Sequence, residues 1–242
     1  MSTITPHILL RAYAAGIFPM AENAEDAALY WVEPEERGII PLDGLHISHS
    51  LRKSVRRQHF EVKIDADFPA VIAACAAKAP HRSSTWINGR IRSLYTQLHR
   101  MGACHSVECW QEGKLAGGLY GVRIGAVFFG ESMFSKAPDA SKVALVHLVA
   151  RLNAGGFRLL DAQFLNAHLA KLGAVTVAQA EYRQMLEPAL DAEADFFAFK
   201  GDNDAELVLK LAGGIEPKAP HPPTSLTRGR PQPSPRKRGE GK

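Results

Sequence analysis

Two polar residues, Asp161 and Gln163, stand two positions apart in the otherwise apolar stretch from Arg158 to Phe164, RLLDAQF. In an extended strand alternate side chains point to the same face, so both polar groups share one face with Leu159. Polar groups are costly to bury unless they are paired or used in chemistry. The pair is therefore our first candidate for a catalytic function.

Other candidate groups fit known chemistry less well. Ser132 lies in Gly-Glu-Ser-Met-Phe, which lacks the final glycine of a nucleophile elbow. The cysteines around His105 do not have the spacing of a zinc site. We expect His147 and His168 to be helix-surface or core histidines, and we expect buried free thiols at all three cysteines, Cys75, Cys104 and Cys109.

A cationic strip is expected on a helix that begins after Ser48, which is a suitable N-cap. Four basic side chains share its face: Arg52, Lys53, Arg56 and Arg57. No acidic residue falls between Asp43 and Glu61, so the strip is either a solvated face or a phosphate-contacting surface. Trp86, which has arginines nearby, either packs in the core or stacks on a base.

The elements that position Asp161 and Gln163 follow from local patterns. A helix over 140–153, capped by Asp139 or Ser141, should lead into their strand at 158–164. Asn166 should cap the next helix, and a strand at 174–177 and a helix at 179–187 should follow.

Upstream, we expect a helix at 7–15, an apolar loop at 16–20, and short strands and loops at 30–47. After the helix that starts at Ser48, a strand at 60–64 should precede an Ala-rich helix and a helix within 81–103. A β meander should place strands at 105–110, 115–122 and 126–130. The glycines of its middle strand indicate either a bulge or close approach by a ligand: Gly117, Gly118 and Gly121.

The composition favours a soluble globular protein. The chain has 242 residues, of which 46% are hydrophobic, so it can bury a substantial core. The net charge of +4 is local, because residues 217–242 hold seven basic residues and one acidic residue, which leaves −2 for residues 1–216. We expect a disordered basic tail over 215–242, no membrane span, no secretory signal and a cytoplasmic location.

Several motifs in order, including AYAAGIFPM, TWINGRI, GESMFS, DASKVAL and LLDAQFLNAHLAKLGA, resemble the bacterial leucyl/phenylalanyl-tRNA protein transferase family. The likeness covers roughly residues 5–190. It implies an α+β fold in which a small N-terminal lobe (1–45) precedes a GNAT-like acyltransferase domain (46–214) with a mixed sheet flanked by helices. It further implies a monomer that needs no metal and no cofactor.

The activity that this resemblance implies is transfer of Leu, Phe or Met from aminoacyl-tRNA to proteins with N-terminal Arg or Lys, which marks them for degradation by the N-end rule. The family's catalytic pair falls on Asp161 and Gln163, where the carboxylate would act through the carboxamide on the incoming amine. Glu131 would attract the basic side chain of the acceptor. The family's aminoacyl pocket falls on five apolar residues: Leu119, Phe128, Met133, Leu145 and Leu148.

The resemblance also assigns contacts with tRNA. Trp86 would contact the terminal adenosine, and the strip from Arg52 to Arg57 would hold acceptor-stem phosphates. Relatives often have Trp where this chain has Met20, which leaves the second aromatic wall of the adenosine site in question.

Two alternative functions compete with this one. An acetyl-CoA dependent N-acetyltransferase would share the fold, but Ser135–Lys142 has no glycine and places Asp139 at a helix start, where a phosphate would be repelled. A non-catalytic RNA-binding module would explain the cationic strip and Trp86, and would leave Glu131 and the Asp161–Gln163 pair without a function.

Overall fold

The computed structural model describes residues 4–26, 28–78 and 84–213. The predicted tail at 215–242 therefore lies outside the described residues. None of the helices in the described chain combines the length and the apolar run that a bilayer crossing needs.

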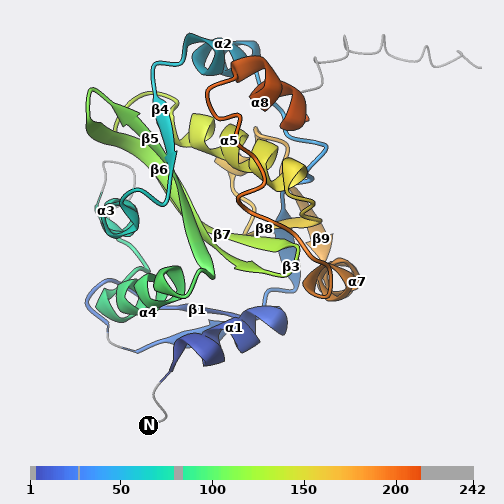
Figure 1. Ribbon diagram of the computed structural model, residues 1–242. Coiled ribbons are helices and arrows are strands. Elements are labelled where there is room, and N and C mark those ends of the chain that lie inside the picture. The colour runs from blue at the N-terminus through green and yellow to red at the C-terminus, as the bar shows by residue number, and fades with distance from the viewer. Residues whose placement is uncertain (1–3, 27, 79–83, 214–242) are drawn as a thin grey trace, which may run out of the picture.

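A mixed seven-stranded sheet forms the centre of the fold (Figure 1). Its spatial order is β4 (Glu61–Ile64), β5 (Cys104–Gln111), β6 (Lys114–Ile124), β7 (Val127–Ser135), β8 (Leu159–Gln163), β3 (Glu36–Ile39) and β9 (Val175–Ala178). Every neighbouring pair is antiparallel except β7 and β8, which are parallel. The expected α+β class and mixed sheet are confirmed.

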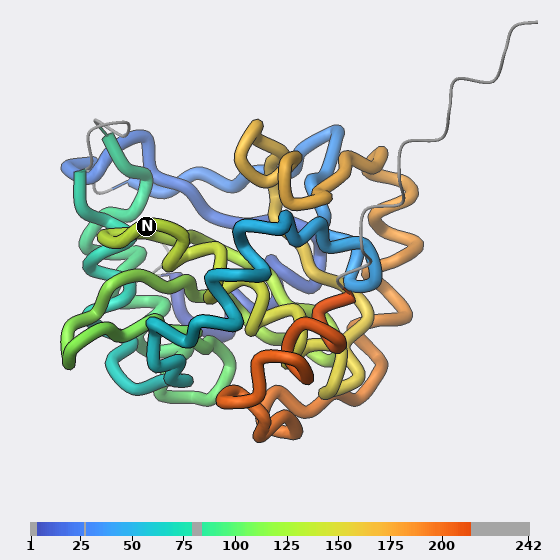
Figure 2. The backbone as a smooth tube through the Cα atoms, turned by 90° about the horizontal axis from the view of Figure 1, so that it is seen from above, coloured from blue at the N-terminus to red at the C-terminus, as the bar shows by residue number. Residues whose placement is uncertain are grey.

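Helices cover both faces of this sheet, and each face has its own hydrophobic core. One core includes α2 (His49–Arg57), α5 (Ala140–Ala154) and α8 (Ala205–Leu211). The other includes α1 (Pro6–Ala14), α3 (Phe68–Ala76), α4 (Gly89–Arg100) and α7 (Gln179–Leu190). Figure 2 shows the N-terminal segment (blue) packed against later parts of the chain.

The N-terminal segment shares structure with the rest of the chain. β3 lies within residues 1–45, yet it pairs with β8 and β9 in the main sheet. α1 packs in the same core as α3 and α4. The division at residue 45 stays a prediction, although the first 45 residues do supply part of the main sheet.

Several local predictions need correction. Residues Phe18–Met20 are not a loop but form strand β1, which pairs with β2 (Tyr30–Val32). β7 runs on to Ser135, so Glu131 lies in the middle of a strand rather than at its end. Sequence patterns also missed α8, a short helix whose buried residues are few. The short helix α6 (Ala167–Ala170) is capped by Asn166 as expected.

The start of α5 also differs from expectation. Asp139 occupies the N-cap position in a left-handed conformation (φ 64°), but its side chain makes no capping hydrogen bond. The Asp139 carboxylate instead accepts hydrogen bonds from Ser54 and Lys142, and Ser135 Oγ accepts one from the Ser141 N–H. Twelve of the fifteen residues of α5 are buried, because the sheet covers one side and α2 and α8 cover another.

The glycines of β6 meet protein atoms rather than an open ligand site. A Cβ added at Gly117 would come within 2.5 Å of the Ala140 Cβ, and one added at Gly121 within 2.3 Å of Phe128 Cε1. The predicted bulge in β6 is confirmed at Ala116, which lies unpaired between the register pairs Gly117–Cys109 and Leu115–Trp110. A second irregularity lies in β7, where Glu131 falls between the pairs Gly130–Gly121 and Ser132–Tyr120. Cys75, Cys104 and Cys109 are buried and form no disulfide within the described chain, also as predicted.

The close approach at Gly121 leaves no room for a side chain. We expect Gly121→Ala to lower the free energy of unfolding by about 1–3 kcal/mol or more, because the new methyl group overlaps Phe128 and the Phe129 carbonyl. Gly89→Ala is the matched control, since its Cβ meets nothing within 4 Å. Urea unfolding of both variants measures the effect, and equal stability of the two would contradict the close packing at Gly121.

Candidate active site

A cavity of about 330 Å³ opens beside the middle of β7 and the C-terminal end of β8. Its size lies at the lower end of the range for small-molecule sites. Its polar lining includes Glu131, Asp161 and Gln163. The remaining wall draws on β1, the segment before α4, β6, α5 and α6, and includes Phe18, Met20, Trp86, Leu119, Met133, Leu145, Leu148, Phe164, His168 and Leu169.

Asp161 is fully buried and held by ionic and polar partners. Arg37 donates to both its oxygens, from Nε to Oδ1 at 2.9 Å and from Nη2 to Oδ2 at 2.6 Å. The Tyr182 hydroxyl donates to Oδ2 at 2.8 Å. Arg37 is 1% exposed and lies between the rings of Phe18 and Tyr182. The carboxylate is thus balanced by a buried guanidinium, and its lone pairs are occupied.

Gln163 connects Asp161 with the cavity. Its backbone N–H donates to Asp161 Oδ1 at 2.8 Å, and its φ of 56° lies in the left-handed region. Such a conformation costs about 1–3 kcal/mol in a residue other than glycine, and the hydrogen bond to Asp161 helps to hold it. The Gln163 side chain reaches Glu131, with Nε2 donating to Oε1 at 3.1 Å. Its carbonyl oxygen is therefore the end of the carboxamide that can accept a hydrogen bond from a ligand.

Glu131 receives three hydrogen bonds from residues on separate elements. Tyr13 Oη donates to Oε1 at 2.6 Å, Tyr95 Oη donates to Oε2 at 3.0 Å, and the third donor is Gln163. Burial raises the pKa of Glu131 to about 7, although the two tyrosine hydrogen bonds act to lower it. Glu131 is thus a carboxyl group that titrates near neutral pH at the cavity wall.

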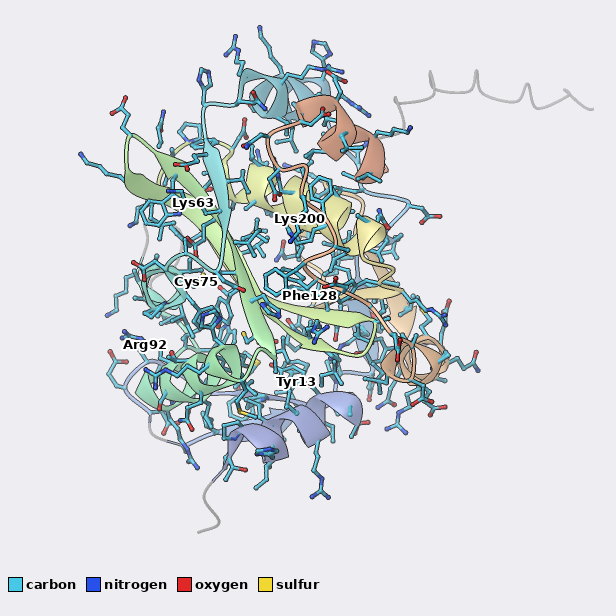
Figure 3. The ribbon with its side chains drawn as sticks, in the orientation of Figure 1. Tyr13, Lys63, Cys75, Arg92, Phe128 and Lys200 are labelled. Carbon is cyan, nitrogen blue, oxygen red and sulfur yellow. The ribbon has the colours of Figure 1, made fainter. Side chains whose placement is uncertain are left out.

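Four of the five apolar residues assigned to the pocket line the cavity: Leu119, Met133, Leu145 and Leu148. Phe128 is the exception. It is fully buried behind the cavity and stacks on Phe196, with ring centroids 5.6 Å apart. Figure 3 shows Phe128 in the interior of the molecule, above Tyr13 of α1. Phe128 therefore supports the packing of the sheet and does not line the cavity.

The two residues assigned to adenosine, Trp86 and Met20, both line the cavity and are partly exposed. Hydrogen bonds fix the backbone around Trp86. The Ile87 N–H donates to Thr85 Oγ1, and Asn88 caps α4 through its Oδ1 while its Nδ2 donates to the Asp26 carbonyl. An aromatic ring is thus presented at the cavity on an ordered segment.

The cationic strip on α2 is only partly as expected. Lys53, Arg56 and Arg57 are exposed, but Arg56 Nε pairs with Glu206 of α8 at 2.7 Å, and Arg52 Nε donates to the Ile47 carbonyl. An acidic residue distant in the sequence therefore offsets part of a charge that had no acidic neighbour along the chain. The strip does not line the cavity.

Sequence reasoning missed four functional candidates, namely Tyr13, Arg37, Tyr95 and Tyr182. They come from α1, β3, α4 and α7 and converge on Glu131 or Asp161. Nothing along the chain distinguishes these tyrosines from ordinary core residues. Arg37 gives no signal either, because the sequence does not show that this arginine is buried.

The arrangement can bind a cation next to a hydrogen-bond acceptor, beside an apolar recess. Ionised Glu131 would attract the cation, the Gln163 carbonyl would accept from an N–H group, and the leucines and Met133 would surround an apolar side chain. Among the described residues, no group of three His, Cys, Asp or Glu side chains is placed to hold a metal ion.

Comparison with known proteins gives consistent results over most of the chain. A family model described as leucyl/phenylalanyl-tRNA protein transferase matches residues 39–187, and the N-terminal domain of the same family matches residues 2–35. A relative from Rhodopseudomonas palustris (strain TIE-1) is 59% identical over 87% of this chain and 94% of its own length. Relatives from Afipia carboxidovorans and Rhodospirillum rubrum are each 57% identical, over 83% and 81% of this chain and 88% and 92% of their own lengths. All three bear the name leucyl/phenylalanyl-tRNA–protein transferase.

Proposed function

The chain belongs to the leucyl/phenylalanyl-tRNA protein transferase family, and on this premise we propose how its cavity performs the reaction and which substrates it accepts. The enzyme transfers Leu or Phe from aminoacyl-tRNA to the N-terminus of a protein. The acceptor begins with Arg or Lys, Met is a third donor residue, and the product is marked for N-end rule degradation. The observation that carries this proposal is the Asp161–Gln163–Glu131 network beside an apolar recess.

The acceptor side of the reaction rests on Glu131 and Gln163. Ionised Glu131 attracts the guanidinium or ammonium group of the acceptor's first side chain. The Gln163 carbonyl accepts a hydrogen bond from the α-amine, which orients its lone pair towards the ester. Asp161 does not touch the substrate in this scheme. It positions Gln163 through the backbone N–H, and Arg37 and Tyr182 hold it in turn.

The chemical step is aminolysis of an activated ester. The amine nitrogen bonds to the aminoacyl carbonyl carbon, the ester C–O bond breaks, and one amine proton ends on the released ribose hydroxyl. The ester supplies its own activation, so alignment and charge stabilisation suffice for catalysis.

The donor side rests on the apolar recess and its rim. Leu119, Met133, Leu145 and Leu148 would surround the transferred side chain. An apolar pocket discriminates by only about 1–3 kcal/mol per methylene, which fits tolerance of Leu, Phe and Met. Trp86 would stack on the terminal adenosine, and Met20 would pack opposite it. The α2 strip, from Arg52 to Arg57, would contact phosphates of the acceptor stem.

The remaining proposals concern the fold type, the oligomeric state and the cellular location. We propose a GNAT-like core, supported by the order of hairpin β6–β7, helix α5, parallel strand β8 and helix α6. We propose a cytoplasmic monomer, and three buried thiols fit a reducing compartment.

Acceptor selectivity provides the direct test of the proposed function. With leucyl-tRNA as donor, we expect a peptide that begins with Arg to yield a Leu-Arg product and one that begins with Ala to yield none, because only Arg offers a cation to Glu131. Mass spectrometry of both products measures this. Equal transfer to the two peptides, or transfer to neither, would overturn the proposal.

A further inference from the structure

We propose that the exposed face of α4 is a second phosphate-binding surface for the donor tRNA, on the opposite side of the cavity from the α2 strip. This α4 surface consists of Arg90, Arg92 and Arg100 with Ser93 and Gln97. The inference rests on the proposed function, since it assigns to the same donor a contact outside the cavity.

The charge distribution of the chain is the first observation. From Phe68 to Val107 there is no Asp or Glu, while Lys78, Arg82, Arg90, Arg92 and Arg100 fall in the same interval. The three arginines of α4 are exposed, whereas its apolar residues Ile91, Leu94, Tyr95 and Leu98 are buried. The helix thus presents an uncompensated cationic face to solvent.

Neighbouring elements do not neutralise this surface. Within the described part of the chain, none of the ion pairs involves Arg90, Arg92 or Arg100. Two carboxylates lie next to α3 and both have partners within the fold. Asp67 caps α3 by accepting from the Ala70 N–H, and Asp65 bonds to His105 and Ser106 and lies 3.7 Å from His99. An acidic loop, with Glu22, Glu25 and Asp26, meets the N-terminal end of α4, where Asn88 Nδ2 donates to the Asp26 carbonyl. Arg92 and Arg100 lie further along the helix.

The shape of the surface suits a phosphate backbone. A shallow groove between α3 and α4 is lined by Arg92, Ser93, Thr96, Gln97 and Arg100. The Thr96 hydroxyl and Gln97 Nε2 donate to the Arg92 and Ser93 carbonyls within the helix, so the two arginines are the main donors for phosphate. Figure 3 shows Arg92 on the outer side of α4. Phosphate contacts of RNA-binding proteins come from such groups and are largely independent of sequence.

The position of the α4 surface selects tRNA over other polyanions. Trp86, which lines the cavity, is only three residues before the first residue of α4, Gly89. The ordered turn at Asn88 joins the two, so a strand that leaves the cavity past Trp86 meets the α4 surface next. Figure 1 places α2 and α4 at opposite ends of the sheet, so the two cationic surfaces flank the donor's path.

Two donors that share the aminoacyl end test this inference. The triple variant Arg90→Ala, Arg92→Ala, Arg100→Ala is assayed with leucyl-tRNA and with 3′-O-leucyl-adenosine, which occupies the cavity alone. We expect kcat/KM to fall about tenfold or more for leucyl-tRNA and to stay unchanged for leucyl-adenosine. The salt dependence of tRNA binding should also weaken, by about 0.9 in log–log slope for each phosphate that the variant no longer neutralises.

A matched control removes three exposed charges elsewhere, in Lys114→Ala, Arg158→Ala, Lys200→Ala, and should bind tRNA as the parent does. An unchanged kcat/KM of the α4 variant with leucyl-tRNA would overturn the inference. So would an equal loss with both donors, or a loss that appears only when an acidic protein acceptor replaces a short peptide. If the parent enzyme used neither donor, the proposed function itself would be wrong. That result concerns the parent and is therefore distinct from the three results for the α4 variant.

Discussion

Asp161→Asn is expected to lower kcat for leucyl transfer by roughly 10² to 10³-fold while the Kd for tRNA stays within about twofold. The asparagine keeps an oxygen that can accept from the Gln163 N–H, but it loses the negative charge that Arg37 balances. Asparagine has one acceptor oxygen where Asp161 has two, and the donors of Arg37 and Tyr182 compete for it with the Gln163 N–H. When the oxygen turns to Arg37 and Tyr182, the amide NH2 group faces the Gln163 N–H, and the Gln163 backbone loses its anchor. Single-turnover transfer and tRNA binding measure the two quantities separately.

Stability must be distinguished from catalysis at this position. Removing one partner of a buried ion pair destabilises a protein by about 3–5 kcal/mol, whereas replacing both by apolar residues is often nearly neutral. The double change Arg37→Met, Asp161→Leu should therefore recover most of the free energy of unfolding that Asp161→Ala loses. It should not recover transfer. Recovery of activity along with stability would show that Asp161 serves only the fold.

The Asp161–Gln163 pair could be identified from the sequence because its signal is local. A strand repeats every two residues, so two polar side chains at that spacing in an apolar run are visible without a structure. Their partners could not be identified in this way. Arg37 is 124 positions from Asp161, and Tyr13 is 118 positions from Glu131. Only the sheet and the packing of α1 against it bring these residues together.

The same limit explains what was missed in the fold. Ser48 and Asn166 were recognised as caps because a cap depends on its next few residues. The pairing of β1 with β2 depends on a partner strand that begins ten residues after β1 ends, and Pro19 in β1 favours a loop in any local pattern. The α2 strip appeared unneutralised for a related reason, since Glu206 lies 150 positions from Arg56.

Phe128 shows a different limit. A residue type that suits an apolar pocket also suits a core, and only the direction of the side chain decides between them. In β7, Phe128 faces the core that contains Phe196, whereas Met133 reaches the cavity. The register shift in β6–β7 at Tyr120–Gly121 alters which β7 side chains share a face, and no alternation rule predicts its place.

The raised pKa of Glu131 should make recognition of the acceptor depend on pH. Burial raises this pKa to about 7, so the carboxylate becomes neutral as the pH falls through 7 and ceases to attract a cationic acceptor. We expect Glu131→Gln to lower kcat/KM for an Arg-peptide by about 30-fold or more at pH 8, since loss of one partner of a desolvated charge pair costs roughly 2–5 kcal/mol. The ratio of parent to variant should approach one near pH 5.5. Because the α-amine also titrates, this ratio, rather than either profile alone, isolates Glu131.

A peptide that begins with citrulline, the neutral counterpart of Arg, provides the control. At pH 8 the parent enzyme should have a higher kcat/KM for the Arg peptide than for the citrulline peptide, and Glu131→Gln should have similar values for both. The free energy of unfolding should change in the opposite direction. Between about pH 4.5 and 7 the folded protein keeps the proton on Glu131 while the unfolded chain loses it, so the parent becomes less stable as the pH rises. Glu131→Gln does not titrate and should therefore gain stability relative to the parent across that interval. Loss of Arg preference together with this gain would show that the buried carboxylate is retained for binding rather than for folding. An Arg preference that is unchanged in the variant would remove Glu131 from the acceptor site.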